Sequence, residues 1–126
     1  MLGKNDVVAF IATAQSDRTK EFYERVLGLD LVEDSPFALV FDAHGTMLRI
    51  QKVKELQPAP YTALGWHVPD IRAAVESLSG KGIRFERYEG VPQDDLGIWL
   101  TPSGAHVAWF KDPSGNILSL TQFPPR

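Results

Sequence analysis

An internal repeat constrains the fold of this chain more than any other feature of its sequence. The stretch VVAFIATAQSDRTKEFYERVLGLDLVED in the first half is matched by TALGWHVPDIRAAVESLSGKGIRFERY in the second. Each is predicted to form a strand, a helix and a further strand, and a glycine ends each helix, at Gly28 and Gly82. Both halves close on a glycine-turned strand, HGTMLRIQ and SGNILSLT. The two halves therefore have equivalent positions that can be compared.

The first half predicts one strand, one helix and three more strands. Val7 to Thr13 is apolar and rich in strand formers, and Ser16 or Asp17 is suited to cap the helix that follows by accepting a backbone N–H. Gly28 suits the left-handed end of that helix. Further strands are expected at 29–32, 37–41 and 46–53, with a tight His44-Gly45 turn before the last of them.

The second half predicts the same plan after a proline-rich break. Asp70 is the expected cap of a helix that ends at 80–82. Strands are expected at 62–68, 83–88, 98–101, 106–110 and 117–121. We expect a single α+β domain over 1–126, with one βαβββ module at about 5–55, a linker at about 55–60 and a second module at about 61–123. Neither module alone buries both faces of its sheet, so the two should pack together.

Composition excludes several classes of protein. The apolar share of 44% and the charged share of 23% are those of an ordinary globular domain. A net charge of −3 without a basic segment argues against a nucleic-acid partner. The chain has no cysteine, which excludes disulfides and thiolate metal sites. No apolar run resembles a signal peptide or a membrane span, so we expect a cytoplasmic protein without a membrane partner.

The segments FYERVLGL and AWFKDPSGN, within the doubled βαβββ plan, resemble the vicinal oxygen chelate superfamily. That superfamily includes glyoxalases, bleomycin-resistance proteins and extradiol dioxygenases. The resemblance extends from about Val7 to Phe123. It implies that the two modules form a cupped mixed sheet that holds a small molecule. It also implies a homodimer, with each cup built within one chain or across two.

The resemblance further implies where a metal would be bound. Metal-dependent members place His, Gln or Glu ligands on the first and last strands of each module, and the open positions of the metal accept two adjacent substrate oxygens. The equivalent positions here are Val8, Arg49, Ala63 and Ser119. None is an ordinary ligand, and the arginine cation repels a metal. A slip of one residue supplies no His or carboxylate either, so we expect no metal cofactor.

Strand alternation predicts what lines the cup instead. Arg49 is the expected anchor for an anionic group, because its guanidinium offers forked donors. Trp99 or Trp109 would supply a flat wall, whereas Trp66 points away by parity. The expected ligand contacts are Arg49, His67, Gln51, Ser119, Phe10, Met47, Trp99 and Trp109.

Each of these residues also has an ordinary structural role as an alternative. Arg49 could pair with Asp42 or Glu55, and His67 could bond a backbone carbonyl. The two tryptophans could be core or dimer contacts. The remaining polar candidates are expected to be structural: His44 and His106, the pair Asp94-Asp95 pointing apart into water, and Asp112 capping its own turn.

Two functions remain open from the sequence. The favoured one is a binding protein that holds a small anionic or aromatic molecule without the usual metal. The alternative is a glyoxalase-like lyase or a dioxygenase-like enzyme acting on a small carbonyl or vicinal-oxygen substrate. Such an enzyme would use an atypical metal site at His67, Gln51 and Glu55, or His67 as base with Arg49 as stabiliser.

Overall fold

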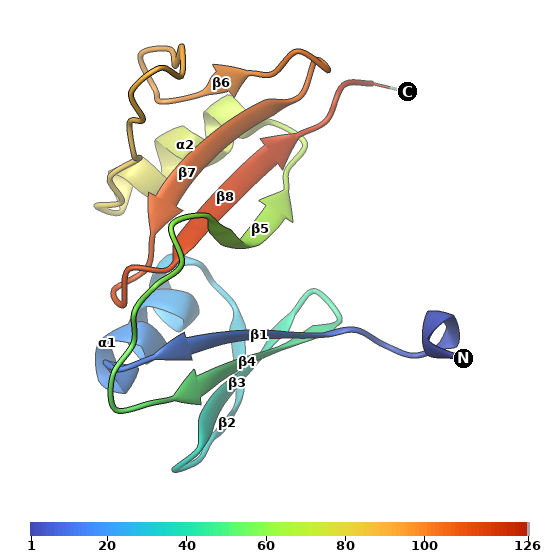
Figure 1. Cartoon of the computed structure of the whole chain (residues 1–126), viewed down its shortest axis with the longest axis vertical. Coiled ribbons are helices and arrows are strands. Elements are labelled where there is room, and N and C mark those ends of the chain that lie inside the picture. The colour runs from blue at the N-terminus through green and yellow to red at the C-terminus, as the bar shows by residue number, and fades with distance from the viewer. Residues whose placement is uncertain (126) are drawn as a thin grey trace. The chain divides into compact units, whose positions relative to one another are not determined.

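In the computed structural model, which describes residues 1–125, the chain divides into two compact units, Met1–Pro58 and the part from Ala59 onward. Each unit contains a four-stranded mixed sheet and a helix (Figure 1). The predicted α+β class with two modules is therefore confirmed.

The first unit has a sheet in the order β1-β4-β3-β2, in which β1 is parallel to β4 and the other pairs are antiparallel. Its first and last strands are therefore neighbours. Its elements are a 3-10 helix Leu2–Lys4, β1 Val8–Thr13, α1 Ser16–Glu21, a π-helical turn Phe22–Val26, β2 Asp30–Asp34, β3 Ala38–Ala43 and β4 Thr46–Lys52.

One face of this sheet carries the core of the first unit. The ring of Tyr23, fully buried in the π-helical turn, lies 5.8 Å from that of Phe41 in β3. The hydroxyls of Thr13 and Thr19 are hydrogen-bonded at 2.8 Å, which satisfies two buried polar groups. Burying a large apolar side chain stabilises a fold by about 1.5–3 kcal/mol, so this face supplies most of the unit's stability.

The start of α1 differs from the prediction. Gln15 is the N-cap, and neither Ser16 nor Asp17 caps the helix, because both already lie in its first turn. The hydroxyl of Thr13 accepts the N–H of Gln15 at 2.9 Å and so fixes the entry of the chain. The end is as predicted: Gly28 has a positive φ of 78°, which permits the left-handed exit.

The second unit repeats this topology with the order β5-β8-β7-β6, and β5 is parallel to β8. Helix α2 packs on β7 and β8 and lies across one face of the sheet (Figure 1). Ile71 and Val75 are its buried residues. The elements are β5 Thr62–His67, α2 Ile71–Gly80, β6 Trp99–Leu100, β7 His106–Lys111 and β8 Ile117–Gln122.

The N-terminus of α2 is capped as predicted. The carboxylate of Asp70 accepts the N–H of Ala73 at 3.1 Å. The side chain of Gln122 in β8 accepts the N–H of Ile71 at 2.8 Å, which ties the helix to the sheet. Two of the otherwise unpaired N–H groups of the first turn are thereby satisfied.

The predicted strand at 83–88 is wrong, because a side chain takes the place of a neighbouring strand. The amide of Gln93 accepts the N–H of Tyr88 at 2.8 Å and donates to the carbonyl of Glu86 at 2.9 Å. The segment contacts the sheet through one backbone bond, from Glu86 N–H to the Trp109 carbonyl. Extended chain is therefore present here without a strand ladder.

The turn DPSGN behaves as the sequence predicts. Asp112 is buried, and its Oδ1 accepts the N–H groups of Ser114 and Asn116, at 2.9 and 3.0 Å. The Asn116 side chain donates to the other carboxylate oxygen at 2.9 Å. Asp112 therefore fixes the turn between β7 and β8, which is a structural role.

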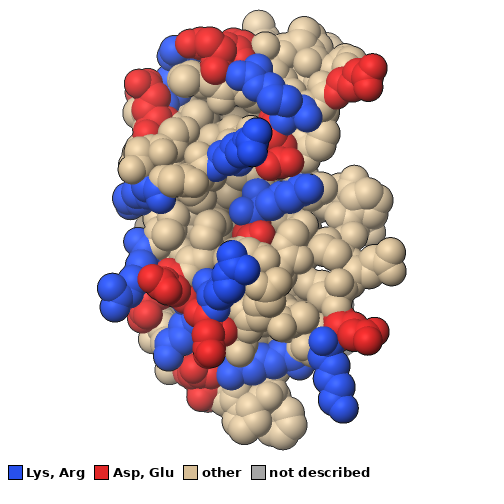
Figure 2. All heavy atoms as spheres, turned by 90° about the vertical axis from the view of Figure 1, so that its left-hand side faces the viewer, with Lys and Arg blue, Asp and Glu red and all other residues tan. Residues whose placement is uncertain are grey.

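Charges of both signs are mixed on the surface. Figure 2 shows Lys and Arg side chains interspersed with Asp and Glu on the face it presents. In the first unit, hydrogen bonding to Lys52 is the main cause that lowers the pKa of Asp34, and Lys20 acts in the same direction. Within residues 1–125, no helix combines the length and the apolar character needed to cross a membrane.

Candidate ligand site

The second sheet has one face covered by α2 and one open face. Leu118, Leu120 and Phe110 are buried on the covered face. Across the ladder, Gly65, Ser119 and Trp109 form one row of the open face, on β5, β8 and β7. The next row is His67, Thr121, Val107 and Trp99, so Trp99 and Trp109 lie on the same face. Strand alternation predicted this placement.

Four aromatic side chains surround a pocket of about 340 Å³ on this unit. Trp99 and Trp109 are stacked, with ring centroids 6.0 Å apart and an interplanar angle of 24°. Tyr88 stands edge-on to Trp109, at 82° and 5.3 Å. The full lining is Pro60, Tyr61, Thr62, Tyr88, Val91, Trp99, Trp109 and Ile117. A concave, mostly apolar pocket of this size suits a small organic molecule.

The bulge in β5 contributes to this pocket. Thr62 pairs with Ile117 and Leu64 pairs with Leu118, so Ala63 is the extra residue. Thr62 and Ile117 both line the pocket as a result. The polypeptide enters β5 through Pro60 and Tyr61, and the side chain of Tyr61 is 69% exposed at the pocket.

Tyr88 carries an unusual polar group. Its hydroxyl oxygen is buried and has no hydrogen-bond partner among residues 1–125. Burial raises the pKa of Tyr88, and the nearby charge of Glu86 raises it further. The phenol therefore keeps its proton to a higher pH than an ordinary tyrosine does.

The first unit also has an open face, and it carries the other predicted contacts. Leu48 and Ile50 point into the core, whereas Met47, Arg49 and Gln51 alternate with them on the other side of β4. Phe10 pairs with Arg49 across the β1–β4 ladder. Arg49 makes no ion pair with any residue that the structure describes, so the suggested pairing with Asp42 or Glu55 is absent there.

The positions where the superfamily would place metal ligands can be tested on this structure. Val8 and Arg49 lie on the open face of the first unit, and Ser119 lies on that of the second. Ala63 sits at the bulge. This set offers one hydroxyl and one cation, which does not fit a divalent metal. No group of three or more His, Cys, Asp or Glu side chains able to hold a metal occurs in the described part of the chain.

The histidines occupy separate places. His67 is exposed at the end of β5, and its ring meets that of Phe123 edge-on at 5.1 Å. Within residues 1–125 the suggested bond from His67 to a backbone carbonyl does not form. His44 forms the β3–β4 turn with a positive φ of 51°, next to Gly45.

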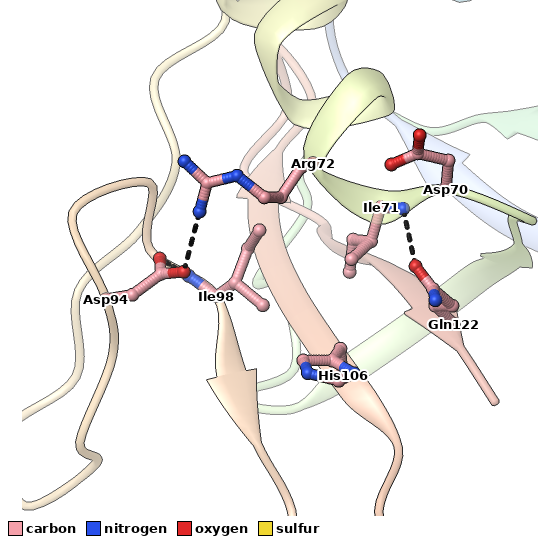
Figure 3. Close-up of a pocket in the computed structure, with 7 residues that line it drawn as sticks. All are labelled: Asp70, Ile71, Arg72, Asp94, Ile98, His106 and Gln122. Atoms are coloured by element: carbon pink, nitrogen blue, oxygen red, sulfur yellow. Dashed lines mark hydrogen bonds and ion pairs between the residues drawn. The ribbon is translucent and has the colours of Figure 1, made fainter. Parts of the chain in front are cut away.

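A second pocket, also of about 340 Å³, lies beside the N-terminus of α2 (Figure 3). Its lining is Asp70, Ile71, Arg72, Asp94, Ile98, His106 and Gln122. Asp94 accepts the N–H groups of Leu96 and Ile98, each at 2.9 Å, and lies 3.4 Å from Arg72. Asp94 is exposed, as predicted, but its carboxylate is also a structural group that organises the loop. Several polar groups of this pocket are therefore already engaged in hydrogen bonds and an ion pair.

Sequence reasoning found two walls of the aromatic pocket and missed two. Trp99 and Trp109 were proposed because strand parity excluded Trp66, and both line the pocket. Tyr88 was expected in a strand that the structure does not form, so alternation there was no guide to its side chain, and Tyr61 stands at the end of the linker, which has no periodic pattern. The only signal available for these two residues was their aromatic type.

Comparisons with known proteins agree with this fold. A family model for the Glyoxalase/Bleomycin resistance protein/Dioxygenase superfamily matches residues 6–120. A superfamily member from Sphaerobacter thermophilus has a similar structure, with a TM-score of 0.75, 22% identity, and coverage of 97% of this chain and 99% of that one. A comparison with curated protein sequences found no match.

Two other solved structures of similar fold have different named activities. Lactoylglutathione lyase from Agrobacterium tumefaciens gives a TM-score of 0.72 at 16% identity, covering 94% of this chain and 93% of that one. TnmS3, an antibiotic binding protein from Streptomyces sp. CB03234, gives 0.68 at 22% identity, covering 96% and 98%. At these identities the similarity shows the fold alone.

Proposed function

The chain belongs to the Glyoxalase/Bleomycin resistance protein/Dioxygenase superfamily, and from this premise we propose that it binds a small aromatic molecule. The observation that carries the proposal is the pocket of the second unit, where Trp99, Trp109, Tyr88 and Tyr61 surround about 340 Å³. Aromatic walls gain from stacking on a flat ligand in addition to the apolar area they bury. A binding protein of the same fold, the antibiotic binder TnmS3, is consistent with this role.

Binding without the family's metal is part of the proposal. Its support is the chemistry at Val8, Arg49, Ala63 and Ser119, which offers no carboxylate or imidazole. The remaining predicted contacts stay proposals on the open face of their own unit: Phe10, Met47, Arg49 and Gln51 on the first, and His67 and Ser119 on the second. Arg49 would hold an anionic group there, since its guanidinium is not engaged by a described carboxylate.

Fluorescence titration with a neutral flat probe, N-phenyl-1-naphthylamine, tests the pocket. Trp109→Leu should weaken binding of the probe about tenfold, because a stacking wall is lost. Trp66→Phe is the matched control: Trp66 pairs with Leu120 on the covered side of the sheet, and its loss should leave affinity unchanged. Equal affinity in the wild type and Trp109→Leu, with both folded by circular dichroism, would contradict the proposal.

Elemental analysis of the protein after mild purification tests the proposal that it binds its ligand without a metal. We expect no divalent metal at one equivalent per chain, because the expected positions lack suitable donors. A stoichiometric metal that resists dialysis would overturn metal-free binding. It would instead support the lyase-like or dioxygenase-like alternative with an unconventional ligand set.

A further inference from the structure

The rings of the aromatic pocket form a corner. Trp99 and Trp109 are close to parallel, at 24°, whereas Tyr88 stands at 82° to Trp109. Tyr61 lines the same pocket. A flat ligand can stack on one of these rings, and a rounded group of the same ligand can touch two rings that stand at right angles to each other. Cages of this kind recognise methylated ammonium groups through the negative faces of their rings.

The charges of the pocket lining and of the residues beside it also bear on which ligand the pocket accepts. None of the side chains that line the pocket carries a formal charge at neutral pH. The ammonium of Lys111 in β7 lies 3.7 Å from the carboxylate of Glu86, so its positive charge is offset. The charge of Glu86 also acts on Tyr88 by raising its pKa, in addition to the effect of burial. The lining therefore carries no charge that would repel a cation and none that would pair with an anion.

From the ring geometry and the uncharged lining, we propose that this pocket binds the quaternary or tertiary ammonium group of a small organic cation. The proposal rests on the proposed function, because it specifies the ligand of the same pocket. The cation contributes attraction to the ring faces that a neutral group of equal shape lacks. No acid within the lining is needed, since the rings themselves supply the negative charge density.

Two probes of the same shape separate the attraction between a cation and the ring faces from the effect of ligand shape. Choline and its neutral isostere 3,3-dimethyl-1-butanol differ in a single positively charged atom. The titration uses a Trp66→Phe background, in which Trp99 and Trp109 are the remaining tryptophans of the chain. We expect choline to bind about 3- to 30-fold more tightly than the isostere. Equal or weaker binding of choline, or no binding of it, would overturn the proposal.

A charge variant outside the lining sharpens the test. Glu86→Gln should weaken choline about two- to threefold and leave the isostere unchanged, because it removes negative potential without changing the pocket walls. Glu76→Gln, an exposed site on α2, is the matched control and should change neither. A loss shared equally by both probes would contradict the electrostatic argument.

A failure of the cation proposal can be distinguished from a failure of the proposed function. If N-phenyl-1-naphthylamine binds in a manner that depends on Trp109 but choline does not outbind its isostere, the pocket is a site for neutral aromatic ligands and the cation proposal fails. If the neutral flat probe is insensitive to Trp109, the proposed function itself fails.

Discussion

Gly65 and Ser119 show how little space the open face of the second sheet leaves at its centre. A Cβ added at Gly65 would lie 2.5 Å from the Ser119 hydroxyl oxygen and 3.4 Å from its carbonyl oxygen. Real Cβ atoms essentially never show the first of these distances. The glycine therefore avoids a close contact with the Ser119 hydroxyl across the β5–β8 pair.

We predict that Gly65→Ala lowers the free energy of unfolding by about 1–2 kcal/mol, because the Ser119 side chain must leave its position. Urea denaturation measures this loss of stability. The Ser119→Ala variant lacks the hydroxyl oxygen that crowds Gly65, so in that background Gly65→Ala should change the free energy of unfolding little.

Gly80→Ala is the control for the two Gly65→Ala measurements. Nothing lies within 4 Å of a Cβ at Gly80, the last residue of α2, so the substitution should be neutral or stabilising by about 0.4–1 kcal/mol. The crowding argument fails if Gly65→Ala costs as much in the Ser119→Ala background as in the wild type.

Prediction from the sequence succeeded at this scale where a residue lies in a regular strand. The alternation of side chains put Arg49, Gln51 and Ser119 on the sheet faces that they occupy in the structure, and it placed Trp66 on the opposite face from Ser119. It failed for Tyr61, whose segment has no period. It also failed for the N-cap of α1, because Ser16 and Asp17 are the preferred capping types but Gln15 takes the position without a side-chain cap.

At the scale of elements, one glutamine replaces a strand. Gln93 bonds the backbone of Tyr88, Glu86 and Gly97, and so joins the extended segment before it to the turn after it. This connection holds Tyr88 against Trp109. The sequence pattern at 83–88 is that of a strand. Nothing in this segment reveals that a side-chain amide, and not a neighbouring strand, will hydrogen-bond its backbone groups.

We predict that Gln93→Ala lowers the free energy of unfolding by about 1–3 kcal/mol, since several partly buried backbone groups lose their partners. Chemical denaturation measures the change, and hydrogen exchange should show faster exchange at the Tyr88 amide. Gln93→Glu keeps an acceptor for that amide but faces two carbonyl oxygens, so it should also destabilise.

The exposed Gln57 provides the control for this prediction. Gln57→Ala removes the same side chain from a segment where no hydrogen bond to it is recorded among residues 1–125, and stability should stay unchanged. An unaltered exchange rate at Tyr88 in Gln93→Ala would show that the extended segment does not depend on the amide.

At the scale of the whole molecule, the open face of the first unit exposes large apolar side chains. The exposed fractions are 40% for Val8, 55% for Phe10, 64% for Val32 and 43% for Met47. Large exposed apolar side chains on one face are typical of an interaction site. The resemblance to a superfamily of dimers led us to expect a homodimer, and this surface supports that proposal.

We predict a mass in solution twice that of one chain, measured by light scattering after size exclusion. Phe10→Glu should shift the equilibrium towards the monomer, because it places a charge on the apolar face. Leu2→Glu, in the N-terminal 3-10 helix at 79% exposure, should have no effect. A monomeric wild type at micromolar concentration would refute the prediction.

The two-sided construction of each sheet has a consequence for how such a protein changes over generations. The helix-covered face holds most of the large buried side chains, whereas the open face includes exposed positions such as Phe10, Met47 and His67. Substitutions on the open face are therefore cheap in stability, apart from crowded points such as Gly65. Selection can exchange one ligand chemistry for another there while the scaffold is inherited unchanged.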